Sequence, residues 1–462
     1  MSADGISFSS IADYAERYRS NGASIHATGT AETLRKSLCL ELNDKPLDGT
    51  EVIRQLTEAV EPGLVRNTDP GFFGWVMGAS DPVGVAADWL TSIWGQNSAI
   101  YQTAPASAIA EEAVSAWLLD LLRLPKESSV AFVTGATMAG FVGLAAARSE
   151  VLRRSGHDFD AQGLQGAPTV KIFVSDDTHV SNLAALRYLG FGQSNIVSVP
   201  SDNRGLIKTA DLSAALSAHD GPRIIISQAG HINSGGFEDY VALSDLSKQY
   251  DAWLHVDGAF GLWARILPEK EHLTKGLECA DSWSVDGHKW LQLPYDSGFA
   301  IVRDEAAHIR AMTKEAGYFN RNPDDGRNPT QFNPELSRRA RSFAAWALIR
   351  HHGREGIANI VRNHCAAAAR LATELQDVSS FSVLDPVDLN QVILMSDHPH
   401  RDHTISELAT LINSDQRFFV RTAQWKSRTV LRISIISQHA DENLIVRLAE
   451  RIKRECKQLE SC

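Results

Sequence analysis

Apolar residues are spaced in two different ways along the chain, and the spacing changes near residue 130. Before that point they recur at positions i, i+3 and i+4, which predicts helices at 12–18, 51–60, 82–94 and 106–124. After it, short apolar runs alternate with helical segments as far as about residue 303. Such alternation is typical of a mostly parallel β-sheet that is covered by helices on both faces.

Seven short runs rich in β-branched and aromatic residues are the predicted strands of this sheet. They lie at 130–133, 170–175, 196–200, 223–228, 253–257, 283–285 and 297–303. Helical runs separate the middle strands at about 178–190, 209–218 and 240–250. Towards the C-terminus the pattern becomes helix, strand, helix, strand, helix, with the strands at 391–395 and 430–437.

These patterns predict an α/β chain in three parts. Residues 1–65 form an N-terminal helical arm with little core of its own, and residues 66–355 form a large domain around the mostly parallel sheet. Residues 356–462 form a small α+β C-terminal domain. A polar, turn-rich segment at 313–336 interrupts the large domain, and its length is typical of either a lid or a disordered connection.

Composition and charge exclude several classes of protein. The 462 residues are 44% hydrophobic and 22% charged, which is the profile of a globular protein. A net charge of −11 does not favour nucleic acid or an anionic membrane as a partner. The sequence has no apolar run of about 18 residues and no basic-then-apolar N-terminus, so we expect neither a membrane-spanning helix nor a signal peptide.

The cysteines and histidines do not predict a metal site. Five widely separated cysteines without a CxxC pair fit a reducing compartment, and we predict a cytoplasmic protein. The segment 397–403 reads Asp-His-Pro-His-Arg-Asp-His, but its spacing fits no fixed ligand geometry. We interpret it as a solvated loop and predict no metal.

A lysine follows one predicted strand at the position where α/β enzymes place their chemistry. The strand around 283–285 runs into Gly287, where the backbone is free to turn, and then into His288 and Lys289. Trp290 follows, so Lys289 is expected in partly apolar surroundings that disfavour its charged form. A neutral amine attacks aldehydes, and pyridoxal 5'-phosphate (PLP) is the natural aldehyde for such a lysine.

A carboxylate ends another buried strand. Asp257 is the last residue of the run Trp-Leu-His-Val-Asp, and a carboxylate is costly there unless it is paired. The pyridinium N–H of PLP is a suitable partner, because an aspartate that keeps the ring protonated makes it a strong electron sink. Ala259, two residues later, is small enough for a ring to lie flat beside it. The alternative is an aspartate that caps a loop.

Two further candidates follow strands of the same sheet. The turn 134–140 consists mainly of small residues between a strand and a helix, so its backbone N–H groups and the Thr137 hydroxyl suit a phosphate. His179 opens a helix after the strand 170–175, where an imidazole can stack on a cofactor ring and transfer a proton. Each feature alone also has an ordinary structural interpretation.

Taken together, these residues resemble a known family. The runs Asp-Gly-His-Lys-Trp-Leu at 286–291, Pro-Tyr-Asp-Ser-Gly at 294–298 and His-Val-Asp-Gly-Ala at 255–259 are similar to those of the group II PLP-dependent amino-acid decarboxylases. The resemblance covers roughly residues 65–440 and implies PLP as the cofactor. It implies that Lys289 forms the Schiff base, that Asp257 pairs with the pyridine nitrogen and that His179 stacks on the ring. The other cofactor-binding residues that it implies are Ala136, Thr137, Ala259 and His288.

The resemblance also implies a fold, an assembly and a proton donor. The fold is the type I PLP-dependent, aspartate-aminotransferase-like fold, in a homodimer with active sites at the interface. Residues 98–101 resemble the segment that reaches into the neighbouring subunit's site. Tyr318 resembles the mobile-loop tyrosine that returns a proton to the α-carbon after carbon dioxide leaves. Relatives with phenylalanine there tend to produce aldehydes by oxidation.

The substrate side departs from the family pattern. The wall that usually reads Tyr-Phe-Pro-Thr is Trp-Val-Met-Gly at 75–78, so Trp75 and Met77 are the predicted substrate-binding residues there. His231 stands where the family usually has a threonine near the cofactor, and we also assign it to substrate binding. Arg432 either binds a carboxylate or pairs with an acid of the chain.

The predicted activity is decarboxylation of an L-amino acid to its amine and carbon dioxide. Other PLP chemistry on the same scaffold is the alternative: an aldehyde synthase, an aminotransferase or a carbon–carbon lyase. A third hypothesis is a cofactor-binding protein without catalysis, which the set of Lys289, Asp257, His179 and Tyr318 disfavours. The identity of the amino acid does not follow from the sequence.

Overall fold

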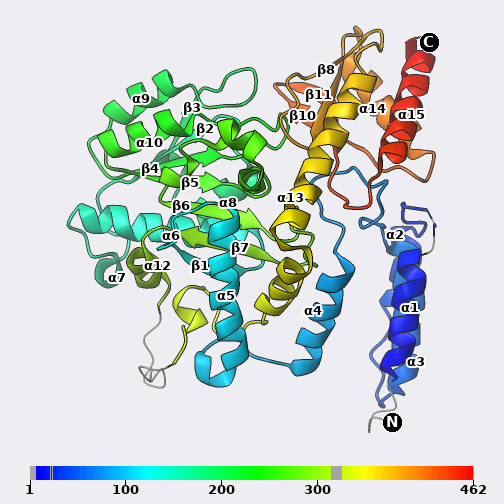
Figure 1. Cartoon of the computed structure of the whole chain (residues 1–462), viewed down its shortest axis with the longest axis horizontal. Coiled ribbons are helices and arrows are strands. Elements are labelled where there is room, and N and C mark those ends of the chain that lie inside the picture. Colours follow the sequence, from blue (N-terminus) through cyan, green and yellow to red (C-terminus); the bar gives the residue numbers. More distant parts are fainter. Residues whose placement is uncertain (1–6, 21, 23, 314–324, 461–462) are drawn as a thin grey trace.

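The computed structural model describes residues 7–20, 22, 24–313 and 325–460. Within these residues the large sheet has seven strands in the order β1-β7-β6-β5-β4-β2-β3, and only β7 runs antiparallel to its neighbours (Figure 1). Its strands are β1 (Ser129–Val133), β2 (Lys171–Ser175), β3 (Ile196–Val199), β4 (Arg223–Gln228), β5 (Ala252–Asp257), β6 (Ser282–Asp286) and β7 (Gly298–Val302). All seven were predicted.

Helices cover both faces of the sheet, because its strands present apolar side chains to both sides. Along β1, Val130 and Phe132 belong to one buried cluster and Ala131 and Val133 to another. The first cluster packs against α5 (Pro105–Leu121), α9 (Thr209–Ser217), α10 (Tyr240–Gln249) and the start of α13 (Ser342–Glu374). The second packs against α6 (Ala136–Arg154), α7 (Phe159–Gln162), α8 (Val180–Tyr188) and α12 (Glu305–Met312).

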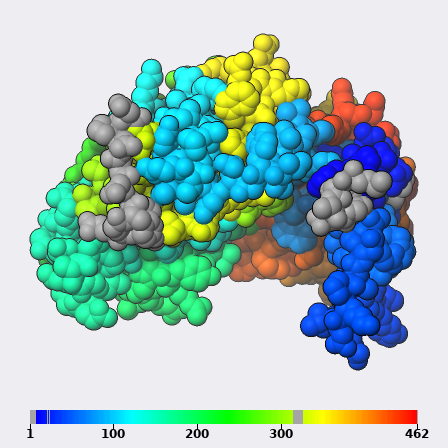
Figure 2. Space-filling model, turned by 90° about the horizontal axis from the view of Figure 1, so that it is seen from below, coloured from blue at the N-terminus to red at the C-terminus, as the bar shows by residue number. Residues whose placement is uncertain are grey.

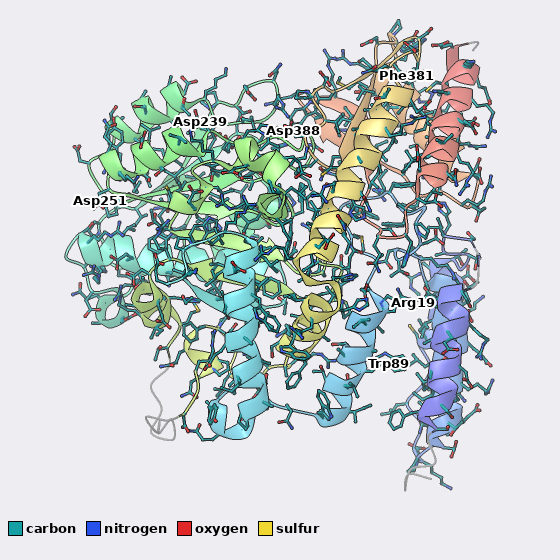
Figure 3. The ribbon with its side chains drawn as sticks, viewed as in Figure 1. Arg19, Trp89, Asp239, Asp251, Phe381 and Asp388 are labelled. Carbon is teal, nitrogen blue, oxygen red and sulfur yellow. The ribbon has the colours of Figure 1, made fainter. Side chains whose placement is uncertain are left out.

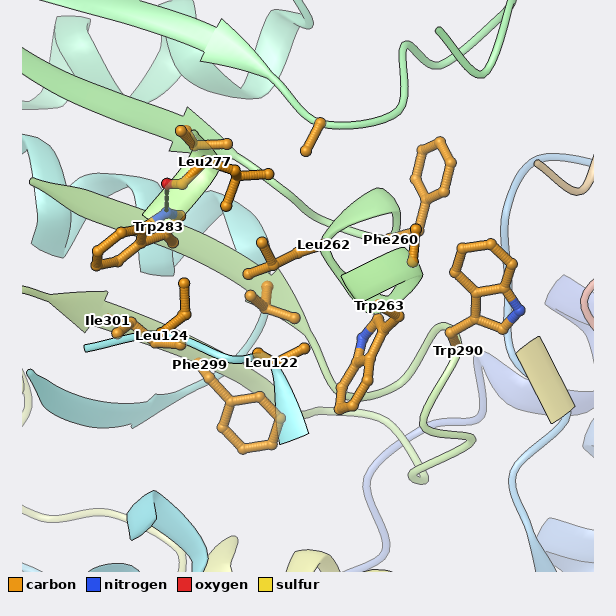
Figure 4. Close-up of a cluster of buried hydrophobic side chains, with 14 of the residues drawn as sticks. Leu122, Leu124, Phe260, Leu262, Trp263, Leu277, Trp283, Trp290, Phe299 and Ile301 are labelled. Carbon is orange, nitrogen blue, oxygen red and sulfur yellow. Dashed lines mark hydrogen bonds between the residues drawn. The ribbon is translucent and has the colours of Figure 1, made fainter. Parts of the chain in front are cut away.

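The first cluster contains three completely buried tryptophans. Trp263, Trp283 and Trp290 are among its largest side chains (Figure 4). Each buried indole N–H has a partner: Trp283 donates to Leu277 O at 3.0 Å and Trp263 donates to Asp286 O at 3.2 Å. The rigid aromatic packing therefore holds the strand ends on which the candidate site is built.

The C-terminal part has its own antiparallel sheet in the order β10-β11-β9-β8. Its strands are β8 (Phe381–Val383), β9 (Gln391–Ser396), β10 (Arg421–Trp425) and β11 (Arg428–Ser434). A third buried cluster joins this sheet to α14 (Arg401–Asn413), α15 (Glu442–Glu460) and the end of α13. Helix α13 therefore connects the two sheets, and it is kinked at Gly353, whose φ is 60°.

The N-terminal helices project from the rest of the molecule (Figures 1 and 2). They are α1 (Phe8–Ser20), α2 (Ala31–Leu38) and α3 (Gly49–Val60), and none of the three contains a buried residue. Arg19 of α1 donates to Ser80 O at 2.7 Å, just before α4 (Pro82–Trp94) begins (Figure 3). The predicted lack of a separate core in this arm is confirmed.

Most predicted elements are present, and the differences are local. The sequence missed the short strands β8 and β10 and the helices α2 and α12, and it divided α13 into two helices. The domain limits at residues 65 and 355 stay a prediction, although the kink at Gly353 lies close to the second limit. No helix in the described part of the chain is long and apolar enough to cross a membrane.

Three buried histidines lie on helices and strands of the fold. His255 lies on β5, His308 on α12 and His364 on α13. Burial lowers the pKa of His255 and His364 to about 4 and that of His308 to about 3, from an ordinary value of 6.5. Their neutral rings are used as hydrogen-bond partners: His364 Nδ1 accepts from Trp290 Nε1 at 2.8 Å.

We expect acid to destabilise the protein through these histidines. Between pH 6.5 and about 4 the unfolded chain binds protons that the folded chain excludes, so the free energy of unfolding falls as the pH falls. Each histidine contributes about 1.4 kcal/mol per pH unit within that window. Thermal unfolding followed by circular dichroism at successive pH values measures this loss. His364→Gln should lose less thermal stability on acidification than the unmodified protein, and an equal loss contradicts the assignment.

Candidate active site

The candidate site lies where the carboxyl ends of the parallel strands meet. Gln228 ends β4, Asp257 ends β5 and Asp286 ends β6, while His179 follows β2. Strands β4, β5 and β6 are neighbours, so residues far apart in sequence share one edge of the sheet. One cavity at this edge is lined by His179, Gln228, Gly230, Ile232, Asp257, Ala259, Phe260 and Lys289.

The carboxylate of Asp257 is held by three donors. Asn182 Nδ2 donates to Oδ2 at 2.9 Å, and the Ala259 N–H and the Ser284 hydroxyl donate to Oδ1 at 3.2 and 3.5 Å. Only 7% of the residue is exposed. These bonds keep a buried carboxylate in a fixed position and direct it to a partner in the cavity.

Lys289 lies beside a second carboxylate. Its Nζ is 2.9 Å from Asp286 Oδ2 and 5.7 Å from the centre of the Phe260 ring. The other oxygen of Asp286 accepts the Ala136 N–H at 2.6 Å and lies 3.4 Å from His288 Nε2. The apolar surroundings predicted for Lys289 are present in part, but the sequence did not anticipate the ion pair with Asp286.

His288 is fixed by its neighbours. Its ring stacks on Tyr295 with 4.2 Å between the ring centres, and its Nδ1 accepts the Ser297 N–H at 3.4 Å. Burial lowers the pKa of His288, so the ring is neutral and carries its proton on Nε2, toward Asp286. Gly135 makes this close packing possible, because a Cβ at that position would lie 3.1 Å from both Asp286 Oδ1 and His288 Cε1.

His179 is both a helix cap and a wall of the cavity. Its Nδ1 accepts the Ser181 N–H at 3.3 Å at the start of α8. Burial lowers the pKa of His179, and the negative charge of Asp257 opposes this effect in part. The ring is therefore neutral near pH 7 with its proton on Nε2, which makes it a proton donor that carries no charge.

The predicted phosphate turn forms the start of α6. Helix α6 begins at Ala136 after Gly135, and Thr137 is exposed at this N-terminus. The Ala136 N–H is already bound to Asp286 Oδ1. The helix N-terminus thus combines an electropositive backbone with a nearby carboxylate, and the assignment of Ala136 and Thr137 to phosphate stays a prediction.

The segment 75–79 packs against the backbone that carries Lys289. Gly78 N–H donates to His288 O at 3.1 Å, and a Cβ on Gly78 would lie only 2.2 Å from that oxygen. The buried side chain of Gln292 connects the parts: it accepts the Ala79 N–H at 2.8 Å and donates to Lys289 O at 2.9 Å and Ile436 O at 2.8 Å. The wall, the lysine loop and the C-terminal part are thereby held together.

The three predicted substrate-binding residues do not line the cavity around Lys289. Trp75 is 42% exposed, and its ring packs on Phe72, Phe419 and the guanidinium of Arg421. Met77 is half-buried in the same wall segment. Their part in substrate binding stays a prediction.

His231 is completely buried behind the cavity. Its Nδ1 accepts the Asn233 N–H at 3.2 Å, and its Nε2 lies 3.3 Å from Asp177 O. The ring also packs on Trp425 with 5.1 Å between the ring centres. With both nitrogens directed to the chain, His231 shapes the loop after β4, and its predicted contact with substrate stays untested.

Arg432 on β11 is a buried cation beside the site. Its Nη1 donates to Asn233 Oδ1 at 3.2 Å, and burial lowers its pKa. Its positive charge also contributes to the lowered pKa of His179, which places it near the cavity. Among the described residues no carboxylate forms an ion pair with Arg432, in contrast to the buried pair of Arg338 and Glu111.

The residues at this edge fit PLP. A lysine, a fixed carboxylate, a neutral imidazole and a small residue share one cavity, and the amide nitrogen of Gln228 is buried there without a partner in the described residues. That arrangement supplies an amine for the aldehyde, an acceptor for the ring N–H and room for a flat ring. Tyr318 lies outside the described residues. The fold and the site together define a PLP-dependent enzyme.

Comparison with known proteins gives the family. The pyridoxal-dependent decarboxylase conserved domain matches residues 32–395, so this chain belongs to that family and is a PLP-dependent carboxy-lyase. The chain is 26% identical to tryptophan decarboxylase 1 of Oryza sativa subsp. japonica, over 88% of this chain and 84% of the relative. It is also 26% identical to the aromatic-L-amino-acid decarboxylase of Bacillus atrophaeus, over 93% and 90%.

Solved structures agree on the fold. The crystal structure of Oryza sativa TDC with PLP and tryptamine matches with a TM-score of 0.90 at 22% identity, over 98% of this chain and 97% of that one. The structure of mouse CSAD matches with a TM-score of 0.87 at 20% identity, over 97% of both chains. The predicted type I fold, family and cofactor are confirmed.

Four residues of the site were not assigned from the sequence: Asn182, Gln228, Phe260 and Asp286. Asn182 follows His179 by three residues on α8, so helical spacing was a usable signal. Asp286 and Gln228 each end a strand, as Asp257 does, and the same rule applied to them would have found both. Phe260 carries no comparable signal.

Proposed function

We propose that this chain removes the α-carboxylate of an L-amino acid and releases the amine and carbon dioxide, with the cofactor's aldehyde carried by Lys289 as a Schiff base. The observation that supports it most is the shared cavity of Lys289 and Asp257. Membership of the decarboxylase family agrees with it. Bound PLP supplies an electron sink for the pair of electrons that remains when a bond to the α-carbon breaks.

In this proposal each residue of the chain has one task. Asp257 accepts the ring N–H, and the donors from Asn182, Ala259 and Ser284 keep its carboxylate aligned. His179 covers one face of the ring and holds a proton on Nε2. Asp286 pairs with the Lys289 amine whenever the amine is free.

Arg432 is the proposed group for a carboxylate of the substrate. Its guanidinium donates a hydrogen bond to the neutral side-chain oxygen of Asn233. A buried cation gains most from an anion that arrives with the ligand, and a guanidinium binds carboxylates through two parallel bonds. The polar loop of residues 231–234 then has a second task, since Asn233 orients Arg432.

Aromatic L-amino acids are the first substrates to consider. Relatives act on tryptophan and on aromatic L-amino acids according to their names. The cavity wall includes Phe260 and Ile232, which suit an apolar side chain.

Aldehyde synthesis is the second candidate function. The chain is 25% identical to the 4-hydroxyphenylacetaldehyde synthase of Rhodiola rosea, over 89% of this chain and 86% of the relative. Tyr318, which by sequence resembles the tyrosine that returns a proton to the α-carbon in the family, favours simple decarboxylation.

We also propose that the enzyme acts as a homodimer. Helix α4 presents Trp89, Leu90, Ile93 and Trp94, which are 39–62% exposed and form one face. The projecting arm adds further exposed apolar residues, namely Phe8, Leu38, Leu40, Leu42, Leu47, Val52, Leu56, Leu64 and Val65. Apolar surface of this extent is typical of an interface between subunits.

The four described cysteines are free, which agrees with the predicted cytoplasmic location.

Product analysis tests the proposed reaction. The PLP-loaded protein is incubated with pooled L-amino acids, and we expect mass spectrometry to detect an amine that is lighter than one substrate by the mass of carbon dioxide. Lys289→Ala is the matched control and should lose activity by several orders of magnitude, because the variant has no amine for the aldehyde. A keto acid as the main product, or full activity in the variant, contradicts the proposal.

Tyr318→Phe tests the route of the proton. Without the phenolic proton we expect slower amine release by roughly a factor of 100, with a larger share of aldehyde among the products. The amine-to-aldehyde ratio is measured by the same mass spectrometry at equal turnover. Tyr188→Phe is the matched control, since Tyr188 is 71% exposed on α8. An unchanged ratio and rate in Tyr318→Phe removes this residue from the mechanism.

Light scattering tests the homodimer. The unmodified enzyme should have twice the mass of the chain, and Ile93→Glu should shift it toward the monomer because it buries a charge in the proposed interface. Tyr188→Glu is the matched control, since Tyr188 is 71% exposed on α8, away from this surface. If the unmodified protein is monomeric at micromolar concentration, the proposed homodimer is contradicted.

A further inference from the structure

Gln228 places an unused hydrogen-bond donor in the wall of the cofactor cavity. The residue ends β4, is only 4% exposed and lines the cavity with Asp257 and Lys289. Its Oε1 accepts the backbone N–H of His179 at 3.2 Å. Because that partner can only donate, the oxygen and nitrogen of the amide are assigned, and Nε2 is the other end. Nε2 has no partner within the described part of the chain.

A buried amide nitrogen without a partner is costly, so its acceptor is expected to come from a ligand. The two side-chain acceptors of the cavity wall, Asp257 and His179, have partners other than Gln228. Asp257 receives bonds from three donors, and His179 Nδ1 is directed to the start of α8. Lys289 is itself a donor. The wall at 75–78 reads Trp-Val-Met-Gly and contributes no hydroxyl near the lysine loop.

The order of the strands indicates which ligand atom faces Gln228. In PLP the aldehyde carbon and the ring nitrogen lie at opposite ends of the pyridine ring. The phosphate arm is attached on one side of the line that joins them, and the phenolic oxygen is attached on the other side. Lys289 and Asp257 mark the two ends of this line. Helix α6, whose N-terminus suits the phosphate, follows β1 at one end of the sheet. Gln228 lies on β4, which is on the opposite side of β5 from β1. Gln228 is therefore on the side of the ring that bears the phenolic oxygen.

We propose that Gln228 Nε2 donates a hydrogen bond to the phenolic oxygen of PLP. A hydrogen bond to this oxygen favours its ionised form. The other end of the same amide, Oε1, accepts the backbone N–H of His179, the residue that covers the ring in the proposed function. Gln228 is thus a cofactor-positioning residue that adjusts the ionisation of the ring. The assignment rests on the roles of Lys289 and Asp257 in the proposed function.

A comparison of two cofactors in two proteins tests this contact. Dissociation constants are measured for PLP and for 3-deoxypyridoxal phosphate, which lacks the phenolic oxygen, with the unmodified protein and with Gln228→Met. We expect the preference for PLP over the deoxy analogue to fall by roughly tenfold or more in the variant. A purely structural role of Gln228 would weaken both cofactors equally and leave the preference unchanged, which overturns the proposal.

The absorption spectrum gives a second reading on the holoenzyme. The visible absorption of the bound cofactor is followed as a function of pH, which gives the pKa of the cofactor. Without the donor this pKa should be higher by about 1 to 2 units, both in Gln228→Met and in Gln228→Ala. Ser227→Ala is the matched control on the same strand, since its hydroxyl donates to His255 O, and it should change neither quantity. An unshifted titration in both Gln228 variants contradicts the proposal. Neither measurement depends on the substrate, so a failed decarboxylation assay leaves the result interpretable.

Discussion

The buried carboxylate of Asp257 is the constraint on which the rest of the site depends. A charge at the end of a strand that is buried along its whole length is tolerated only with several partners. Asn182, Ala259 and Ser284 supply them from three different segments, so the position of α8 and the turn after β5 are both set by this carboxylate. The carboxylate also lines the cavity, where, in the proposed function, the cofactor's ring N–H is its partner.

A second constraint holds the lysine at the right place. The segment that carries Lys289 is bound through Asp286 to the start of α6 and through Gln292 to the wall at residue 79 and to Ile436. Gly78 is needed because its neighbour is a backbone carbonyl at close range. These contacts join residues that are 144 to 213 positions apart in the sequence, and they hold the Lys289 amine in the cavity that Asp257 also lines.

The side chains of the site fall into a charged group and a neutral group. Asp257, Asp286, Lys289 and Arg432 are ionic, whereas His179 and His288 are held neutral by burial. Neutral donors are suited to moving a proton or fixing an oxygen without competing with the charged groups that bind the ring and the carboxylate. Gln228 belongs to this neutral set, and its amide extends the network from His179 toward the ring.

The sequence by itself predicted the seven strands, most of the covering helices and the cofactor, and it singled out Lys289 and Asp257 as candidates, because these inferences depend on apolar periodicity and on residues that follow strand ends. Only the tertiary structure decided which side chains share a cavity. Trp75 and His231 have suitable chemistry but are directed to Phe419 and to Asp177, whereas Gln228 and Asp286 reach the site. The order of the strands and the direction of the side chains depend on contacts between distant parts of the chain. The spacing of residues along the sequence therefore does not predict them.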